Sequence, residues 1–174
     1  TSLYPVRLSP QAELAHSIKT IKEQLRAVPD KGIGYGALRY LGDAAIRAQL
    51  QALAQPRITF NYLGQFDGSF DGDNGALFAP SGEPVGEEKS PDTPLGNWLT
   101  LNSQVYDNRL NMAWTFSREM FTEAQVEQLA QYCREALEQL IEHCSSGEHL
   151  GLTPSDFPLT SLTQQQLDAL PIPV

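Results

Sequence analysis

The sequence is poor in cysteine, in basic side chains and in long apolar segments. Of its 174 residues only 2 are Cys and 12 are Lys or Arg, against 21 Asp or Glu, so the formal net charge is −9. An acidic chain has no excess of cations to neutralise a phosphate backbone, which disfavours nucleic-acid binding. No segment approaches the roughly 20 consecutive apolar residues of a membrane span. The first residues also lack the basic region and apolar run of a signal peptide.

The cysteines and histidines form no metal or disulfide pattern. Cys133 and Cys144 fall in one expected helix, about 16 Å apart along its axis, which is too far for a bridge. Unpaired thiols are typical of a reducing compartment, so a cytoplasmic protein is expected. His16, His143 and His149 have no partner at zinc-ligand spacing. These residues therefore predict no metal site and no complete active site.

Positive charge is concentrated in the first third of the chain. Residues 1–57 hold eight basic and four acidic side chains, whereas the rest is acidic. The acidic C-terminal part is typical of a solvated helix face. The basic third could face an acidic partner, and the cations considered for that role are Lys19, Lys22, Arg26 and Lys31.

Apolar spacing predicts two helices in the first third of the chain. Ser9 as N-cap and Pro10 at the first helical position open the first helix, over about residues 10–28. The segment from Pro29 to Gly32 ends it. A shorter helix is expected to follow Asp43.

The middle of the chain changes to strand periodicity. Residues 58–63 alternate in polarity, and 98–106 with 109–117 predict a hairpin around the tight turn Asp107-Asn108. Residues 64–94 predict a long irregular excursion, with at most a short strand near residues 77–78. With the helices on either side, this order favours an α+β fold with a mainly antiparallel sheet packed against helices.

Capping signals mark the C-terminal helices. Thr122 and Gln125 form a capping box that opens the longest expected helix, which continues to about residue 144. Residues 153–158 predict an ordered loop, and residues 163–170 predict a short helix leading into a proline-rich linker.

Two glycine-rich segments have spacings that argue against ligand binding. Residues 32–36 lack the preceding strand of a dinucleotide loop, so a tight glycine turn is predicted instead. Residues 67–75 resemble a calcium loop, but Phe78 stands where a bidentate Glu is required, which favours an exposed acidic turn.

Three segments match motifs of one known family. Residues 29–36 read PDKGIGYG and match the PxxGxGYG motif. Residues 60–67 are identical to the FNYLGQFD motif. Thr1, Tyr4 and Pro5 match the end of a third motif, GWFTxxYP. The chain therefore resembles the C-terminal half of an epimerization domain of nonribosomal peptide synthetases.

The resemblance implies one lobe of a two-lobed fold. Such domains resemble condensation domains and chloramphenicol acetyltransferase, with two similar lobes around a tunnel that carrier proteins reach from both sides. Residues 1–158 would form the C-terminal lobe, and residues 159–174 an exit linker towards the next synthetase domain. The implied partners are the N-terminal lobe, a peptidyl carrier protein domain and neighbouring synthetase domains.

The resemblance also implies an isomerase activity. Such domains invert the Cα centre of an aminoacyl or peptidyl thioester carried on the phosphopantetheine of a carrier protein, without a bound cofactor. The family's HHxxxDG and EGHGRE motifs are not in this sequence. No catalytic residue is therefore assigned, and the lobe alone is expected to be inactive.

The FNYLGQFD segment allows two interpretations. In the first, Asn61 or Tyr62 lines the tunnel and positions an oxyanion, although strand alternation lets only one reach it unless a bulge intervenes. In the second, the segment only packs, with Phe60, Tyr62 and Phe66 in the core and Gly64 at a bend. The remaining motif residues are predicted to be structural: Gln65 and Asp67 in this segment, and Gly32, Gly34, Tyr35 and Gly36 in a turn beside the tunnel.

Two other functions remain open at this point. The chain could dock a carrier protein through its basic first third, or it could be the lobe of a condensation-type acyltransferase. The FNYLGQFD match disfavours the acyltransferase, because condensation domains differ there.

Overall fold

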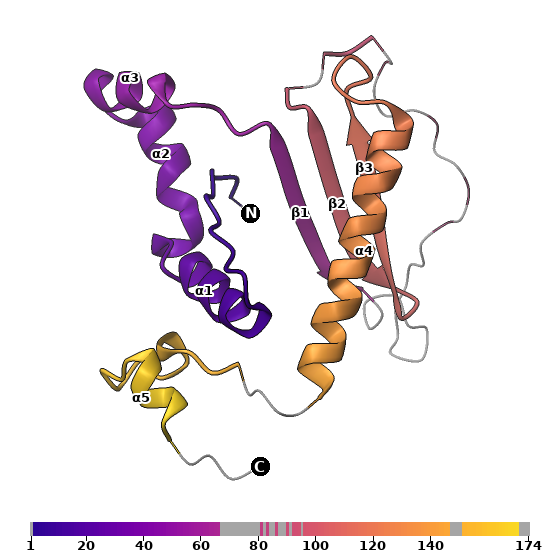
Figure 1. Cartoon of the computed structure of the whole chain (residues 1–174). Helices are drawn as coiled ribbons and strands as arrows, with labels where there is room; N and C mark the ends of the chain where they lie inside the picture. Colours follow the sequence, from indigo (N-terminus) through magenta and orange to yellow (C-terminus); the bar gives the residue numbers. More distant parts are fainter. Residues whose placement is uncertain are drawn as a thin grey trace. The chain divides into compact units, whose positions relative to one another are not determined.

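The computed structural model describes residues 2–66, 96–146 and 151–170, together with 81, 83, 86, 90 and 92–94. These residues divide into two compact units, one of residues 1–55 and 132–174 and the other of residues 56–131 (Figure 1). The acidic turn at 67–75 and the short strand near 77–78, both predicted above, lie outside the described residues. Within the described part, no helix combines the length and apolarity needed to cross a membrane.

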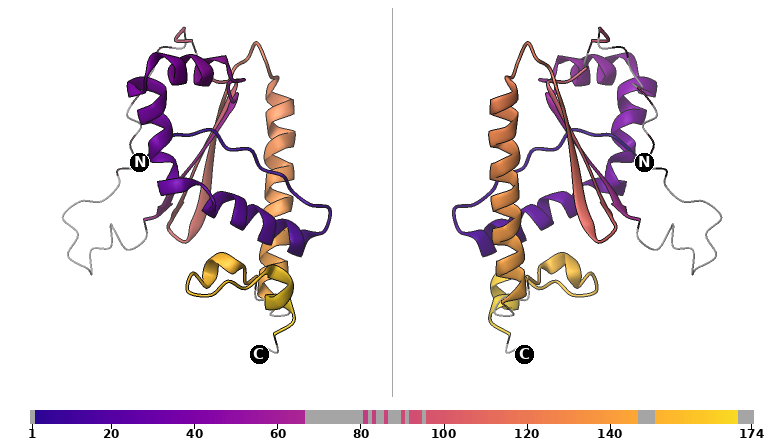
Figure 2. Two further views of the ribbon diagram at one scale, coloured as in Figure 1. Left: turned by 90° about the vertical axis from the view of Figure 1, so that its left-hand side faces the viewer. Right: turned by 90° about the vertical axis from the view of Figure 1, so that its right-hand side faces the viewer.

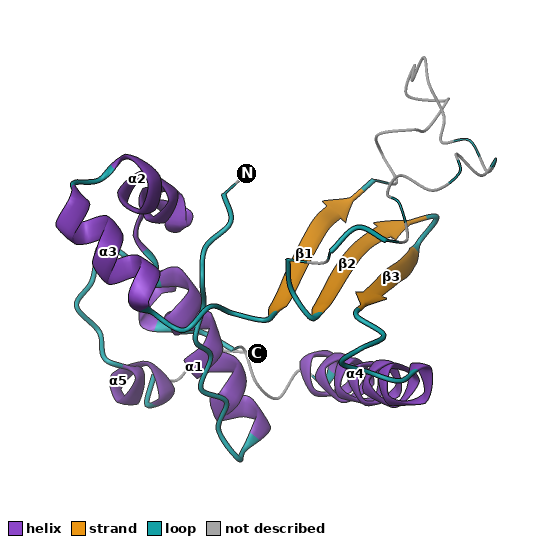
Figure 3. Cartoon of the chain, turned by 90° about the horizontal axis from the view of Figure 1, so that it is seen from above, coloured by secondary structure: helices purple, strands orange, loops and turns teal. Residues whose placement is uncertain are grey.

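Unit 56–131 contains a three-stranded sheet in the order β1-β2-β3 (Figure 3). The strands are β1 (Ile58–Gln65), β2 (Leu99–Tyr106) and β3 (Arg109–Phe116). The predicted hairpin is confirmed: β2 and β3 are antiparallel, and both turn residues have positive φ, 53° at Asp107 and 52° at Asn108. β1 pairs with β2 in parallel, so the sheet is mixed. The α+β class is confirmed.

The two faces of this sheet differ in polarity. On one face of β2, Leu99, Leu101 and Ser103 are only 5%, 8% and 3% exposed. Val126, in the first turns of α4 (Glu123–Ser145), is 5% exposed. The first turns of α4 belong to the same unit and run along one side of the sheet (Figure 2), and the burial of Val126 together with Leu99 and Leu101 indicates that this is the apolar side. The opposite face carries Thr and Asn side chains.

The long helix α4 begins where its capping signal predicts. The Thr122 backbone N–H donates to Gln125 Oε1 at 2.9 Å, and the Gln125 N–H donates to Thr122 Oγ1 at 3.3 Å. This reciprocal capping satisfies two backbone donors that the helix itself leaves without acceptors. Cys133 and Cys144 both lie on α4 and are free thiols, as expected.

Unit 1–55/132–174 begins with α1 (Leu14–Arg26), and its predicted start at Ser9 and Pro10 is wrong. Glu13 is the N-cap, and its carboxylate accepts the backbone N–H groups of Ala15 at 2.9 Å and His16 at 2.7 Å. A carboxylate that holds two of these N–H groups caps more strongly than a hydroxyl four residues earlier. The same two hydrogen bonds lower the pKa of Glu13.

The glycine motif is part turn and part helix. The turn is the 3₁₀ segment η1 (Pro29–Gly32), in which Asp30, Lys31 and Gly32 all have positive φ. The chain then enters α2 (Ile33–Leu41), so the prediction of a turn through residues 34–36 is wrong. Glycine has low helix propensity, which is why a helix containing Gly34 and Gly36 was not expected. Helix α3 (Ala44–Ala52) follows Asp43 as predicted, and the Asp43 carboxylate caps it.

The C-terminal part of this unit holds two short capped elements. Thr153 and Asp156 form a capping box at η4 (Pro154–Asp156), and Thr163 and Gln166 form another at α5 (Gln164–Asp168). Thr153 is fully buried and Leu167 is 3% exposed. The predicted exit linker at 159–174 therefore includes, up to residue 170, a capped helix with a buried side chain.

Candidate functional site

The FNYLGQFD segment forms most of β1, and its register places polar side chains together on one face of the sheet. Thr59 is paired with Thr100, and Asn61 with Asn102, across the parallel β1-β2 pair. Residues in register on parallel strands point to the same side. The four side chains are half-buried and carry no charge. They lie on the face opposite Leu101 and Ser103.

Hydrogen bonds join these side chains in two neighbouring groups, one of amides and one of hydroxyls around Asn97, which together form the amide and hydroxyl cluster. Asn61 Nδ2 donates to Asn102 Oδ1 at 3.3 Å. Asn97 Nδ2 lies 2.8 Å from Thr59 Oγ1 and 2.6 Å from Thr100 Oγ1. Through these contacts both strands hold the cluster, so its geometry depends on the β1-β2 register.

The Asn61–Asn102 pair keeps unused donors. Among the described residues, the only side-chain hydrogen bond of Asn61 is the one it gives to Asn102, and the Asn102 amide nitrogen donates to none. An Asn amide nitrogen carries two N–H donors. Within the described part of the chain, one N–H of Asn61 and both of Asn102 therefore have no acceptor, and such donors suit a ligand carbonyl or oxyanion.

Tyr62 lies on the other face of β1. Asn61 and Tyr62 are paired with consecutive residues of β2, Asn102 and Ser103, so they alternate as in a regular strand. The register shift comes only after Tyr62, around Gly64, whose φ is +99°. The bulge therefore does not bring the two side chains to one side.

The packing interpretation of this segment finds little support in burial. Phe60 is 62% exposed and Tyr62 52% exposed, so neither is a core side chain of this structure. Gly64 lies at the bulge, in agreement with the predicted bend. Gln65 ends β1 opposite Val105, and Asp67 lies outside the described residues.

The glycine motif belongs to the other unit. Gly32, Gly34, Tyr35 and Gly36 lie in residues 1–55, whereas Asn61 lies in residues 56–131. Tyr35 accepts a hydrogen bond at its hydroxyl from Arg39 Nη1 at 2.8 Å. The described contacts of the motif are therefore internal to its own unit.

Sequence reasoning did not identify Asn97 and Asn102. Alternation along residues 98–106 places Asn102 with Thr100 on one face, and that signal was readable. Its pairing with Asn61 needed the parallel register of β1 and β2, which strand periodicity alone does not provide.

The basic residues proposed for docking make ion pairs within their own unit. Lys19 Nζ contacts Asp168 at 2.6 Å, Lys22 Nζ contacts Asp156 at 2.5 Å, and Arg26 Nη1 contacts Asp156 at 2.6 Å. The hydrogen bond from Lys22, and next to it that from Arg26, hold the pKa of the Asp156 carboxyl well below its usual range. Lys19 lowers the pKa of Asp168 in the same way. The three cations thus share two carboxylates of residues 156–168, those of Asp156 and Asp168. Lys31 is exposed in η1.

Glu23 and Ser155 reinforce this attachment of the C-terminal segment to α1. Ser155 Oγ donates to Glu23 Oε1 at 2.5 Å and accepts from Arg26 Nη1 at 2.8 Å. The Ser155 hydroxyl lowers the pKa of Glu23 because its hydrogen bond favours the carboxylate. The resulting network joins segments that are 129 or more residues apart in the sequence.

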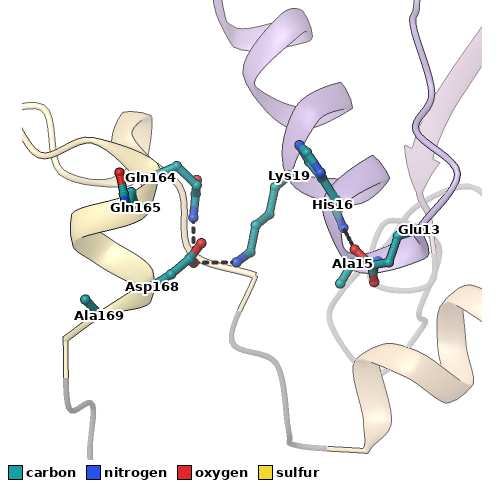
Figure 4. Close-up of a pocket in the computed structure, with 8 residues that line it drawn as sticks. All are labelled: Glu13, Ala15, His16, Lys19, Gln164, Gln165, Asp168 and Ala169. Carbon is teal, nitrogen blue, oxygen red and sulfur yellow. Dashed lines mark hydrogen bonds and ion pairs between the residues drawn. The ribbon is translucent and has the colours of Figure 1, made fainter.

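An open groove of about 590 Å³ lies beside this network, between α1 and α5 (Figure 4). Lys19 Nζ and Gln164 Nε2 both donate to Asp168 Oδ1, at 2.6 and 2.9 Å. His16 lines the groove without a catalytic partner in hydrogen-bond contact among the described residues. These polar groups are occupied in holding α5, and the groove does not coincide with the FNYLGQFD segment. Within the described ranges no three His, Cys, Asp or Glu side chains are grouped to hold a metal ion.

Comparison with known proteins places the chain among synthetase domains. The model of the Condensation domain family matches residues 1–163. Linear gramicidin synthase subunits C and B of Brevibacillus parabrevis are 41% and 44% identical to it over 171 residues. Each alignment covers 97% of this chain but only 2% and 3% of the respective relative, so the chain spans a small part of those proteins.

A solved structure shows the same arrangement of elements. The crystal structure of the epimerization domain from the third module of tyrocidine synthetase B is similar with a TM-score of 0.67 and 36% sequence identity. The similarity covers 78% of this chain and 29% of that chain. These comparisons confirm the family and the lobe fold predicted from the motifs. The chain belongs to the condensation domain family, as a condensation or epimerization-type domain of nonribosomal peptide synthetases.

Proposed function

We propose that the chain is the C-terminal lobe of an epimerization domain that converts L- to D-configured aminoacyl or peptidyl thioesters on a carrier protein. The observation that carries the proposal is the FNYLGQFD segment, in a chain of which 78% is similar to an epimerization-domain structure. The reaction removes the Cα proton from one face and returns a proton to the other. The thioester acidifies that proton, and the developing enolate oxygen needs hydrogen-bond donors.

In this proposal the polar face of the β1-β2 sheet borders the substrate tunnel. The free N–H of Asn61 is a neutral donor that can stabilise the enolate oxygen without trapping it as an ion pair. The apolar face is the less suitable surface, because the first turns of α4 cover part of it. Tyr62 shares that apolar face, so Asn61 is the stronger candidate of the two.

The proton-transferring groups lie outside this chain in the same proposal. The sequence has no HHxxxDG motif, and none of its three histidines is adjacent to another. The lobe alone is therefore expected to epimerize nothing. It needs the N-terminal lobe, and its substrate arrives on the phosphopantetheine of a carrier domain.

The proposal is tested in the intact domain that contains this chain. Loss of Cα deuterium from a carrier-bound aminoacyl thioester, followed with chiral analysis of the released amino acid, reports the reaction. We expect Asn61→Ala to slow exchange by about 100-fold, the lower end for loss of an oxyanion donor. Tyr62→Phe should have a smaller effect.

A matched control and two other outcomes keep the test decisive. Asn111→Ala removes an exposed amide on β3 whose one hydrogen bond among the described residues goes to the backbone oxygen of Arg109, and it should leave exchange unchanged. Unchanged exchange in both Asn61→Ala and Tyr62→Phe removes these residues from the mechanism. Condensation without any Cα exchange in the wild-type domain identifies an acyltransferase instead.

A further inference from the structure

We propose that Asn102 is a positioning residue of the same site, which fixes the orientation of the Asn61 amide. The inference rests on the proposed function, because Asn61 is the donor in that reaction. Asn102 lies in β2, 41 residues from Asn61 and outside the matched motifs. The parallel register brings the two side chains together.

The geometry gives Asn102 a specific effect on Asn61. A free Asn amide can rotate by half a turn and exchange its carbonyl oxygen for its nitrogen at any given position. Asn102 Oδ1 accepts from Asn61 Nδ2 at 3.3 Å, and an acceptor at that position is compatible with only one of the two orientations. While Asn102 Oδ1 accepts this hydrogen bond, the second N–H of Asn61 points away from Asn102.

A second residue of β2 holds the backbone of Asn61. Ser103 Oγ donates to the Asn61 carbonyl oxygen at 3.3 Å, and Ser103 is only 3% exposed. The main chain at Asn61 is therefore fixed independently of Asn102. Loss of the Asn102 side chain should release the amide of Asn61 without moving its strand.

Asn97 has a different role in the cluster. Its Nδ2 contacts the two threonine hydroxyls and the Leu99 carbonyl oxygen, and it makes no hydrogen bond to Asn61 or Asn102. It joins β1 to β2 at the Thr59–Thr100 pair, two residues before the asparagines along each strand. It is thus a structural neighbour, useful as a comparison for Asn102.

A double-mutant cycle in the intact domain separates positioning from folding. We expect Asn102→Ala to lower kcat for Cα deuterium exchange by about 3- to 10-fold, the range for one uncharged hydrogen bond, with KM unchanged. In the Asn61→Ala background the same substitution should change kcat by less than 2-fold, because the group it orients is gone. Asn111→Ala is the matched control, and unfolding midpoints are measured for every variant.

Each outcome decides between the alternatives. The positioning role is overturned if Asn102→Ala lowers kcat equally in the wild-type and Asn61→Ala backgrounds. It is also overturned if Asn102→Ala exchanges Cα deuterium at the wild-type rate while Asn61→Ala is slow. Unchanged exchange in Asn61→Ala is a failure of the proposed function itself. If Asn102→Ala unfolds the domain, Asn102→Asp keeps an acceptor, and the two Asn61 side-chain amide protons must then keep their wild-type pattern of nuclear Overhauser contacts. An altered pattern in that variant contradicts the inference.

Discussion

Gly32 offers a sharp test of the turn that precedes α2. Its φ is +78°, and a Cβ built at this position would overlap the ring of Tyr4. An alanine in the left-handed region costs about 1–2 kcal/mol, and overpacking against a ring typically adds about 1–3 kcal/mol. Gly32→Ala should therefore lower the free energy of unfolding by about 2–5 kcal/mol.

Gly36 is the matched control, because it belongs to the same motif but has open space around it. A Cβ at Gly36 meets no atom within 4 Å, and the residue lies inside α2. Alanine in a helix is about 0.5–1 kcal/mol more favourable than glycine, so Gly36→Ala should be as stable as wild type or more stable. Urea unfolding followed by far-ultraviolet circular dichroism measures both variants.

A second substitution separates strain from collision at Gly32. In a Tyr4→Ala background the ring is gone, so Gly32→Ala should cost only the backbone part, about 1–2 kcal/mol. The reasoning is refuted if Gly32→Ala is as stable as Gly36→Ala. It is also wrong about Tyr4 if removing the ring leaves the cost of Gly32→Ala unchanged.

Three further predictions address the ion-pair network, the sheet core and the long helix. The pKa of Asp156 is lowered in the folded state, so its contribution to stability is complete above its ordinary pKa, near 4, and is lost as the pH falls below that value. The unfolding midpoint of Asp156→Asn should therefore change less between pH 5 and pH 3 than that of the wild type. Leu101→Ala should lower the free energy of unfolding by about 2–5 kcal/mol, since the side chain is 8% exposed. Leu63→Ala, at a 52% exposed site, should lower it by less than about 1 kcal/mol. Equal losses of stability would contradict this assignment of the core. Thr122→Ala should cost about 1 kcal/mol by removing the N-cap of α4, and Thr122→Ser should restore most of it; an unchanged urea midpoint in Thr122→Ala would exclude the cap as a stabilising feature.

The network on α1 changes how a docking experiment must be designed. Charge reversal at Lys19 or Lys22 would place a carboxylate beside Asp168 or Asp156 and disturb the attachment of residues 151–168. Weakened carrier binding in those variants would not separate docking from local unfolding. Lys31 is exposed and makes no side-chain ion pair among the described residues, so its reversal is the cleaner probe of a carrier surface.

Local features of the fold were predictable because their determinants lie within one turn of the chain. The Asp107-Asn108 turn tolerates positive φ, and the Thr122–Gln125 capping box involves residues three apart. The family was readable for a similar reason, since the FNYLGQFD segment is contiguous. The start of α1 was missed because Ser9 is a favoured N-cap residue and Glu13 is not, so only the completed hydrogen bonds identify Glu13 as the cap.

The composition of the site depended on contacts between distant segments. The sequence by itself determined the family, the hairpin, the capping box of α4 and the presence of Asn61 and Tyr62 on opposite faces of one strand. Only the tertiary structure decided that β1 pairs in parallel with β2, that Asn102 meets Asn61, and that Lys22 and Arg26 contact Asp156. Alternation specifies which side of a strand a residue occupies, whereas register and long-range ion pairs depend on which segments pack together.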